Sequence, residues 1–257
     1  MNKILIHAIS DTHNRHDKIK GLTGGDLLIH AGDFSSQGHK WESERFLEWM
    51  RKQPYSAKVL ICGNHEREIE DTKTSGYEFK FKMMCKDAGI ILLQDSSVEL
   101  QFLPGKVFID ENIPDLPKVK IHGSPVTPWF YGHNWGWNRA RNDAEAELYK
   151  VPLIKSHWDI IPPDTNILLT HGPAYGILDE LHSVDGTPKG QFVGCVDLLA
   201  RIKEIKPDIH ICGHIHAHGG SQVHQDGTSF YNASICDEMY APSNPITKIE
   251  YEIVDAE

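Results

Sequence analysis

The sequence lacks any long apolar run. None of its apolar segments reaches the ~18–20 residues that a membrane-spanning helix requires. The first residues lead directly into the apolar segment 4–9, without the basic stretch, long apolar region and small-residue cleavage site of a signal peptide. We therefore expect no membrane span and no secretory leader.

Paired cysteine spacing is absent too, and basic residues are fewer than acidic ones. The five cysteines are odd in number and irregularly spaced, so without a signal peptide they predict reduced thiols and a cytoplasmic location.

The 26 basic residues are outnumbered by 36 acidic ones, and the formal net charge is −10. Long nucleic acids and anionic membranes are bound through many Lys/Arg–phosphate contacts, so this balance disfavours both partners. A small phosphorylated ligand held by metal ions stays compatible with it.

Linkers, internal repeats and low-complexity tracts are also missing. The 257 residues, of which 40% are apolar and 24% charged, are typical of a soluble globular protein and can bury a sizeable core. We therefore expect a single domain over residues 1–257. Whether the chain forms a homo-oligomer is left open.

What the sequence does contain is a series of short apolar runs that end in polar side chains. Each run has the length and composition of a buried strand. Ligand sites in open α/β sheets lie beyond the carboxyl ends of the strands, so polar residues on one sheet edge can converge. The runs are 4–9, 27–31, 58–62, 166–170 and 208–212, and the polar residues after them are Asp11, His13, Asp33, Asn64, His65, His171, His214 and His216.

These polar residues have the donor atoms of a metal centre. They offer oxygen and imidazole ligands without a thiolate, which suits Mn²⁺, Fe, Zn, Co or Ni. Seven ligands over two ions, with one shared carboxylate, make a two-metal centre whose ions lie ~3.5–4 Å apart. Each strand end alone is better explained by a polar turn, but five in series favour the metal centre.

Read as motifs, the same residues resemble a known family. The order of the motifs is similar to that of the calcineurin-like metallophosphoesterases, over almost the whole chain. These motifs are Ser10-Asp11-Thr12-His13, Ala31-Gly32-Asp33, Gly63-Asn64-His65-Glu66, Thr170-His171-Gly172-Pro173 and Gly213-His214-Ile215-His216. Two further segments, 123–129 and 231–234, are most similar to the class III cyclic-nucleotide phosphodiesterase subgroup.

The resemblance implies a fold and a role for each motif residue. It implies a four-layer αββα sandwich of class α/β, in which two mixed sheets pack face to face with helices outside. The early alternation of strands and helices, followed by a hairpin-rich half, agrees with this fold. We expect the late strands, 229–232 and 246–254, to complete the second sheet. One metal would be held by Asp11, His13 and His216, the other by Asn64, His171 and His214, with Asp33 bridging them and His65 facing the phosphoryl group.

The activity that follows is metal-dependent phosphoester hydrolysis, with His65 and Asp33 as catalytic residues. Our first hypothesis is a phosphodiesterase for small phosphodiesters such as 2′,3′- or 3′,5′-cyclic nucleotides, using two Mn²⁺ ions and in-line attack of a metal-bridging hydroxide. His65 would donate a proton to the leaving oxygen or bind a phosphoryl oxygen. A phosphomonoesterase, or a phosphatase for phosphorylated protein or nucleotide, is the alternative on the same site. A nuclease is disfavoured by the net charge, and a non-catalytic scaffold by the intact ligand set.

Substrate contacts are expected from the loops near these motifs. Residues 128–141 lack periodicity and predict a long loop rich in aromatic side chains. This loop could cap the cleft and stack a nucleobase, or form a satellite core or an oligomer interface. The candidate substrate-binding residues are Asn14, Arg15, Trp129, Arg139, Arg141 and His218.

Overall fold

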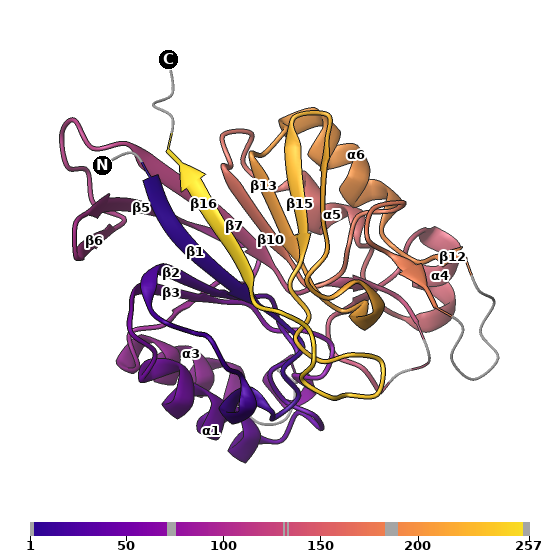
Figure 1. Cartoon of the computed structure of the whole chain (residues 1–257). Helices are drawn as coiled ribbons and strands as arrows, with labels where there is room; N and C mark the ends of the chain where they lie inside the picture. The colour runs from indigo at the N-terminus through magenta and orange to yellow at the C-terminus, as the bar shows by residue number, and fades with distance from the viewer. Residues whose placement is uncertain (1–2, 71–75, 131, 133, 183–189, 254–257) are drawn as a thin grey trace.

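Two large β-sheets dominate the computed structural model, which describes residues 3–70, 76–130, 132, 134–182 and 190–253 (Figure 1). The first sheet has five strands in the order β16-β1-β2-β3-β4. The second has seven strands in the order β14-β15-β13-β10-β7-β5-β6. Short two-stranded pairs, β8 with β9 and β11 with β12, complete the described strands.

The first sheet is parallel except at one edge. Strands β1 to β4 run parallel, and β16 is antiparallel to β1. Alternate side chains of β1 point to opposite faces, so that Ile6 and Ala8 face the second sheet while Ile9 packs toward the helices. Both faces are covered, which explains the continuous apolar runs. The strands are β1 (Lys3–Ile9), β2 (Gly25–His30), β3 (Tyr55–Leu60), β4 (Ile91–Leu92) and β16 (Thr247–Glu252).

The second sheet has a parallel centre and antiparallel edges. Strands β7, β10, β13 and β15 are parallel, whereas β5, β6 and β14 pair in antiparallel fashion. Strands β5 and β6 form a hairpin that turns around residues 103–106. The strands are β5 (Ser96–Leu103), β6 (Lys106–Ile109), β7 (Lys118–Ser124), β10 (Ile167–Thr170), β13 (Ile209–Cys212), β14 (Gln222–Gln225) and β15 (Thr228–Asn232).

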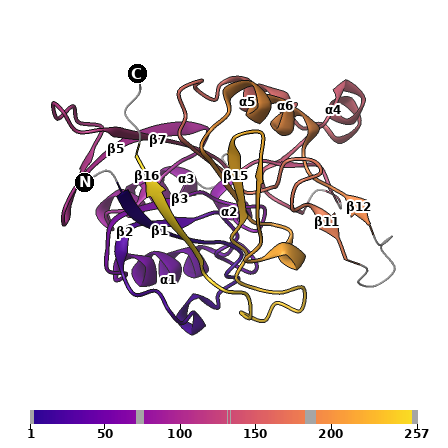
Figure 2. The same cartoon turned by 45° about the horizontal axis from the view of Figure 1, so that its top comes forward.

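Helices cover the outer face of each sheet, which confirms the four-layer α/β architecture (Figures 1 and 2). On the first sheet, Phe46 of α1 and Phe81 of α3 belong to the buried cluster on the face away from the second sheet. On the second sheet, Trp158 of α5 and Leu198 of α6 belong to the buried cluster on the face away from the first sheet. The helices are α1 (Lys40–Arg51), α2 (Arg67–Glu70), α3 (Tyr77–Asp87), α4 (Asp143–Tyr149), α5 (Lys155–Asp159) and α6 (Val196–Ile205), with short 3₁₀ turns η1 (His16–Lys18) and η2 (His216–His218). None of the described helices has the length and apolar character to cross a membrane.

The last strand was assigned to the wrong sheet by the sequence pattern. Residues 246–254 were expected in the second sheet, but β16 pairs with β1 of the first sheet, with Ile249 opposite Ile6. Its alternating burial, with Ile249 and Tyr251 buried and Glu250 exposed, is that of an edge strand. Such alternation fits the edge of either sheet, so only the pairing itself identifies the partner.

The loop at 128–141 also differs in detail from expectation. The loop contains the paired strands β8 (Thr127–Pro128) and β9 (Asn138–Arg139). Two helices, α4 and α5, follow the loop, and a left-handed conformation of Lys150 (φ 58°) ends the first of them.

Candidate metal centre

The polar strand ends meet where the two sheets pack against each other. We expected them on one edge of one sheet, but β1, β2 and β3 belong to the first sheet and β10 and β13 to the second. The loops that follow these strands are joined by backbone hydrogen bonds such as Gly213 N to His171 O (3.0 Å). They approach so closely that a Cβ atom at Gly213 would overlap Ser10 Oγ and Asp11 Oδ2. Convergence therefore depends on the packing of both sheets.

Asp11, His13 and His216 form the first cluster. His216 Nε2 lies 3.4 Å from Asp11 Oδ1 and 3.2 Å from His13 Nε2. His13 Nε2 lies 4.0 Å from Asp11 Oδ1. The three side chains are close enough to share one ion.

Asp33, Asn64, His171 and His214 form the second cluster. His171 Nε2 lies 3.3 Å from Asp33 Oδ2 and 2.9 Å from Asn64 Oδ1. Ligand atoms of Asp33, His171 and His214 lie within 4.8 Å of one another. Asp33 also groups with His13 and His65 at the same spacing, so its carboxylate lies between the two clusters. We call the seven residues of both clusters the ligand cluster.

Backbone carbonyls orient the imidazoles of the ligand cluster. The Nδ1 atoms of three histidines donate to a carbonyl oxygen: His13 to Ser35 (3.1 Å), His171 to Ala31 (2.8 Å) and His216 to Asp237 (2.9 Å). A carbonyl only accepts, so each Nδ1 carries a proton, and Nε2 is the nitrogen that faces the centre. This is the usual arrangement of a metal-binding histidine.

One carboxylate oxygen accepts no hydrogen bond, although His216 Nε2 lies 3.4 Å from it. Asp11 Oδ2 accepts hydrogen bonds from the His214 amide (2.9 Å) and from Ser234 Oγ (2.8 Å). Asp11 Oδ1 is buried, and no described residue donates a hydrogen bond to it. A buried anionic oxygen without a partner is costly, and a divalent cation beside His13 and His216 would satisfy it. The residues present therefore fit the metals that the motifs imply.

Burial and charge set the protonation of the histidines. Burial lowers the pKa of His13 to about 4 and that of His214 to about 3, so both are neutral ligands near pH 7. Burial also acts to lower the pKa of His171, but the Asp33 carboxylate outweighs it and raises that pKa to about 9. In the metal-free protein, a proton on His171 therefore supplies the positive charge beside Asp33 that a bound cation would otherwise supply.

The loops that carry the ligands are held in uncommon backbone conformations. Asp11 (φ 51°), Asp33 (φ 56°) and His214 (φ 67°) all lie in the left-handed region. Such strain persists only where the surroundings fix it, and it is frequent at functional sites. Glu66 supplies part of that support, because its carboxyl group accepts from the amides of Asp33 (2.9 Å) and Gly63 (2.7 Å).

His65 lies beside the ligand cluster. Its Nε2 is 3.8 Å from Asp33 Oδ2, and its Nδ1 donates to Ser36 O over 2.6 Å. Its backbone amide donates to Asp33 Oδ1 (2.8 Å), which ties the His65 turn to the carboxylate between the clusters. The side chain is buried but reaches the cavity next to the ligand cluster.

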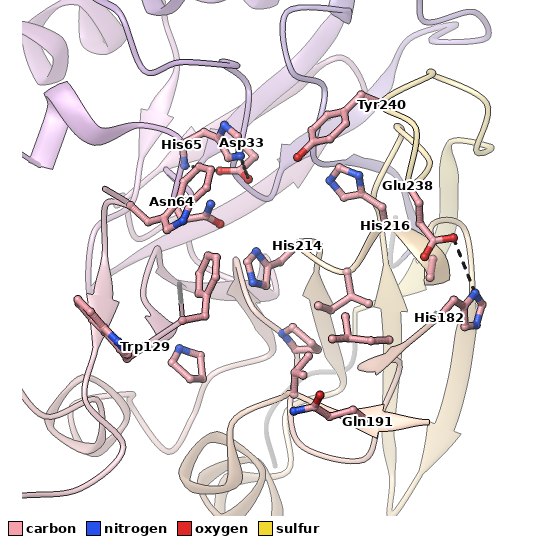
Figure 3. A pocket seen from close by; sticks show the side chains of 18 of the residues that line it. Asp33, Asn64, His65, Trp129, His182, Gln191, His214, His216, Glu238 and Tyr240 are labelled. Atoms are coloured by element: carbon pink, nitrogen blue, oxygen red, sulfur yellow. Dashed lines mark hydrogen bonds and ion pairs between the residues drawn. The ribbon is translucent and has the colours of Figure 1, made fainter. Parts of the chain in front are cut away.

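A cavity of about 740 Å³ opens directly onto the ligand cluster (Figure 3). Phe130 and Trp135, here called the aromatic wall, line one part of it, and their rings are stacked with centroids 5.9 Å apart. The Trp135 ring lies 4.7 Å from His65, and the Phe130 ring 5.0 Å from His214. Residues 131 and 133 of the same loop lie outside the described residues.

Two of the six expected substrate contacts line this cavity: Trp129 and Arg141. Arg139 does not, because its guanidinium donates to Glu70 Oε1 (2.8 Å) and to His157 Nε2 (3.1 Å) on the other side of the loop. Asn14 donates to the Glu42 carboxylate.

Arg15 and His218 do not line the cavity either. Arg15 is exposed, and His218 Nε2 donates to Glu180 O over 3.0 Å. These assignments came from nearness to a motif in the sequence, which does not fix the direction of a side chain.

Several cavity residues were not found from the sequence. Gln191 and His182 come from the hairpin of β11 (Glu180–Leu181) and β12 (Gln191–Phe192), and Glu238 and Tyr240 from the loop after β15. None of them belongs to a motif. The aromatic side chain of Tyr240 is the one feature that could have drawn attention.

Comparison with known proteins agrees with the fold and the site. The model of the calcineurin-like phosphoesterase family matches residues 4–218. The human and mouse proteins named metallophosphoesterase domain-containing protein 1 are each 37% identical over 246 residues, covering 93% of this chain and 68% of the relative. Among solved structures, the phosphopantetheinyl hydrolase PptH from Mycobacterium tuberculosis shares the fold, with a TM-score of 0.54, 15% identity and 95% coverage of both chains.

The fold and the clustered side chains define a metal-dependent phosphoester hydrolase. The chain belongs to the calcineurin-like phosphoesterase family. Its members use divalent metal ions, and the His/Asp clusters described above could hold them.

Proposed function

We propose that this enzyme is a phosphodiesterase of the class III cyclic-nucleotide subgroup that hydrolyses small phosphodiesters such as 2′,3′- or 3′,5′-cyclic nucleotides. Two Mn²⁺ ions are its proposed metals. The observation that carries the proposal is the charge of the cavity beside the ligand cluster. Among the described residues that line it, Arg141 is the one arginine or lysine, and Glu238 adds a negative charge.

This charge favours a diester over a monoester. A phosphomonoester is a dianion near neutral pH and needs more positive charge than a singly charged diester. Arg141 is itself engaged, because it donates to Trp129 O (2.7 Å) and lies 3.6 Å from the Glu145 carboxylate. Apart from the proposed ions, little cationic charge is therefore left for a second negative charge on the substrate.

The size and lining of the cavity suit a nucleotide. Its volume of about 740 Å³ lies within the range of small-molecule sites. The aromatic wall offers flat apolar surface beside His65 and His214, on which a base can stack. A nucleoside cyclic phosphate could thus place its phosphoryl group at the ligand cluster and its base on the wall.

The proposed roles of the residues follow from their positions. One ion would be held by Asp11, His13 and His216, and the other by Asn64, His171 and His214. Asp33 would contribute to the binding of both ions. Bound ions of this kind polarise the phosphoryl group and lower the pKa of water. His65, fixed through Nδ1 by Ser36 O, presents Nε2 to the cavity, from which a protonated imidazole can pass its proton to the leaving ester oxygen.

Two further proposals concern the whole chain. We propose that residues 1–257 form one domain, which is supported by a core shared between both sheets, from Ile4 to Ile253. We also propose a cytoplasmic location, which is supported by five buried cysteines that are all free thiols.

A substrate panel tests the proposed activity. With added Mn²⁺, the panel compares 2′,3′- and 3′,5′-cyclic nucleotides, an aryl phosphodiester, an aryl phosphomonoester and single-stranded DNA. We expect hydrolysis of the diesters, with a cyclic nucleotide as the best substrate. Activity on the monoester alone would overturn the proposal.

A further inference from the structure

Tyr240 lies against the ligand cluster, although no motif contains it. Its ring meets the imidazole of His13 at a centroid distance of 4.8 Å and that of His216 at 5.2 Å, both edge-on. It lines the cavity, and Figure 3 shows its hydroxyl directed toward the space between Asp33 and His216. The hydroxyl is thus close to where a phosphoryl group would bind.

The Tyr240 hydroxyl is a free donor. Within the described part of the chain it makes no hydrogen bond, and the residue is 44% exposed. At this exposure water can serve as its partner, and a ligand acceptor can replace that water. A phosphoryl oxygen beside the ligand cluster would supply one, and the bond would be strengthened by the charge of the acceptor. A neutral donor also suits a cavity that is poor in cationic side chains.

The backbone of Tyr240 is held in place by its own loop. Its φ of 59° is left-handed, which is uncommon for an aromatic residue and requires support from the surroundings. Asp237 provides it: its carboxylate accepts from the amides of Met239 and Ala241, both over 2.9 Å, and from Ser243 Oγ (2.7 Å). The Tyr240 amide donates to Asp237 O (2.9 Å).

Asp237 also connects this loop to the ligand cluster. The carbonyl oxygen that binds the Tyr240 amide accepts the Nδ1 proton of His216 over 2.9 Å. One residue therefore orients an expected metal ligand through its main chain and Tyr240 through both its main chain and its carboxylate. A change of the side chain alone leaves the bond to His216 in place.

We propose that Tyr240 is a substrate-binding residue of this phosphoesterase, whose hydroxyl donates a hydrogen bond to a phosphoryl oxygen, and that Asp237 is the residue that positions it. The inference rests on the proposed function in placing the phosphorus of the substrate at the ligand cluster. It does not depend on whether the substrate is a diester or a monoester.

The first test compares Tyr240→Phe with the wild type, both loaded with Mn²⁺. Calorimetry measures the binding of inorganic phosphate, and steady-state kinetics measures kcat and KM for bis(p-nitrophenyl) phosphate. Loss of one hydrogen bond to a charged acceptor should weaken phosphate binding about 10-fold and raise KM by a similar factor, with kcat and metal content little changed. Tyr175→Phe is the matched control, since Tyr175 is 43% exposed and does not line the cavity. Unchanged phosphate affinity and KM in Tyr240→Phe would overturn the proposal.

The second test separates positioning from general damage. Asp237→Ala should show the same losses as Tyr240→Phe, and the double variant should lose no more than either single variant. Additive losses would contradict the role of Asp237. If the wild type hydrolyses only monoesters, the proposed diester activity fails, whereas phosphate binding still decides the role of Tyr240.

Discussion

Ser234 donates its hydroxyl to Asp11 Oδ2 over 2.8 Å and so joins the loop after β15 to the loop after β1. The His214 amide binds the same oxygen from a third loop. Both bonds point Asp11 Oδ1 toward His13 and His216. Asp11 Oδ2 thus links three loops of the fold, and Asp11 Oδ1 remains available to a metal ion.

Because the two oxygens of Asp11 have different contacts, Asp11→Asn should affect the two ions unequally. The amide removes the charge that faces His13 and His216, whereas Asp33 and its neighbours are unchanged. Bound metal should fall from about two ions per chain to about one, because Asp33 can still serve the second ion. Elemental analysis after dialysis measures the ratio, and Asp17→Asn, a change at an exposed carboxylate paired with Arg45, serves as control. A variant that kept both ions would show the assignment to be wrong.

His65 should matter for turnover rather than for metal binding. Its Nε2 reaches the cavity at 3.8 Å from Asp33, and its Nδ1 is held by Ser36 O. Removal of a general acid typically lowers the rate by about 10²–10⁴-fold, so His65→Ala should lower kcat by that order with metal content near normal. His224→Ala, at an exposed position of β14, should leave both unchanged. Loss of both ions in His65→Ala would contradict the assigned role.

The aromatic wall should discriminate between substrates with and without a base. Stacking on one aromatic side chain is worth about 1–3 kcal/mol per base, so Trp135→Leu should lower kcat/KM for a cyclic nucleotide about 10-fold or more. The corresponding ribose cyclic phosphate, which has no base, should be affected much less. Trp41→Leu is the control, because Trp41 is 57% exposed on α1. Equal losses on both substrates would rule out stacking on this wall.

The sequence pointed to the residues that the structure brings together in the ligand cluster because two signals coincide there. In each case an apolar run marks a buried strand, and the residue types after it have metal-binding atoms. Asp33 after β2 and His171 after β10 show this, since the structure brings them within 3.3 Å from different sheets. The sheet assignment was wrong because the pattern marks strands without naming their partners, as the pairing of β16 with β1 illustrates.

Which loop residues reach the cavity could not be read from the sequence, for a related reason. Arg139 and Arg141 are two residues apart in a loop without periodicity, yet only Arg141 reaches the cavity. The direction of Arg139 is set by Glu70, which lies 69 positions earlier in the chain. A hydrogen-bond partner this distant in the sequence leaves no local signal at the arginine. The loop residues could therefore be proposed as substrate contacts only as a group.

Buried histidines next to the ligand cluster should make the stability of the protein depend on pH, and His210 is the clearest case. Its ring is buried, and Nε2 donates to Thr170 Oγ1 (2.8 Å), whose hydroxyl donates onward to Gly172 O (2.7 Å). Burial lowers the pKa of His210 from 6.5 to about 3. Between these values the unfolded chain binds a proton that the folded chain does not.

The sign of the effect follows from this difference in bound protons. The contribution of neutral His210 is fully present above the unfolded pKa of about 6.5 and is lost as the pH falls toward about 3, by up to about 1.4 kcal/mol per pH unit. His210→Gln keeps a donor for Thr170 but does not titrate. Its free energy of unfolding should therefore fall less steeply between pH 7 and pH 5, by about 1–2 kcal/mol, in urea titrations of the metal-free protein. His224→Gln should keep the wild-type slope, and an equally steep fall in His210→Gln would show that His210 is not held neutral by the fold.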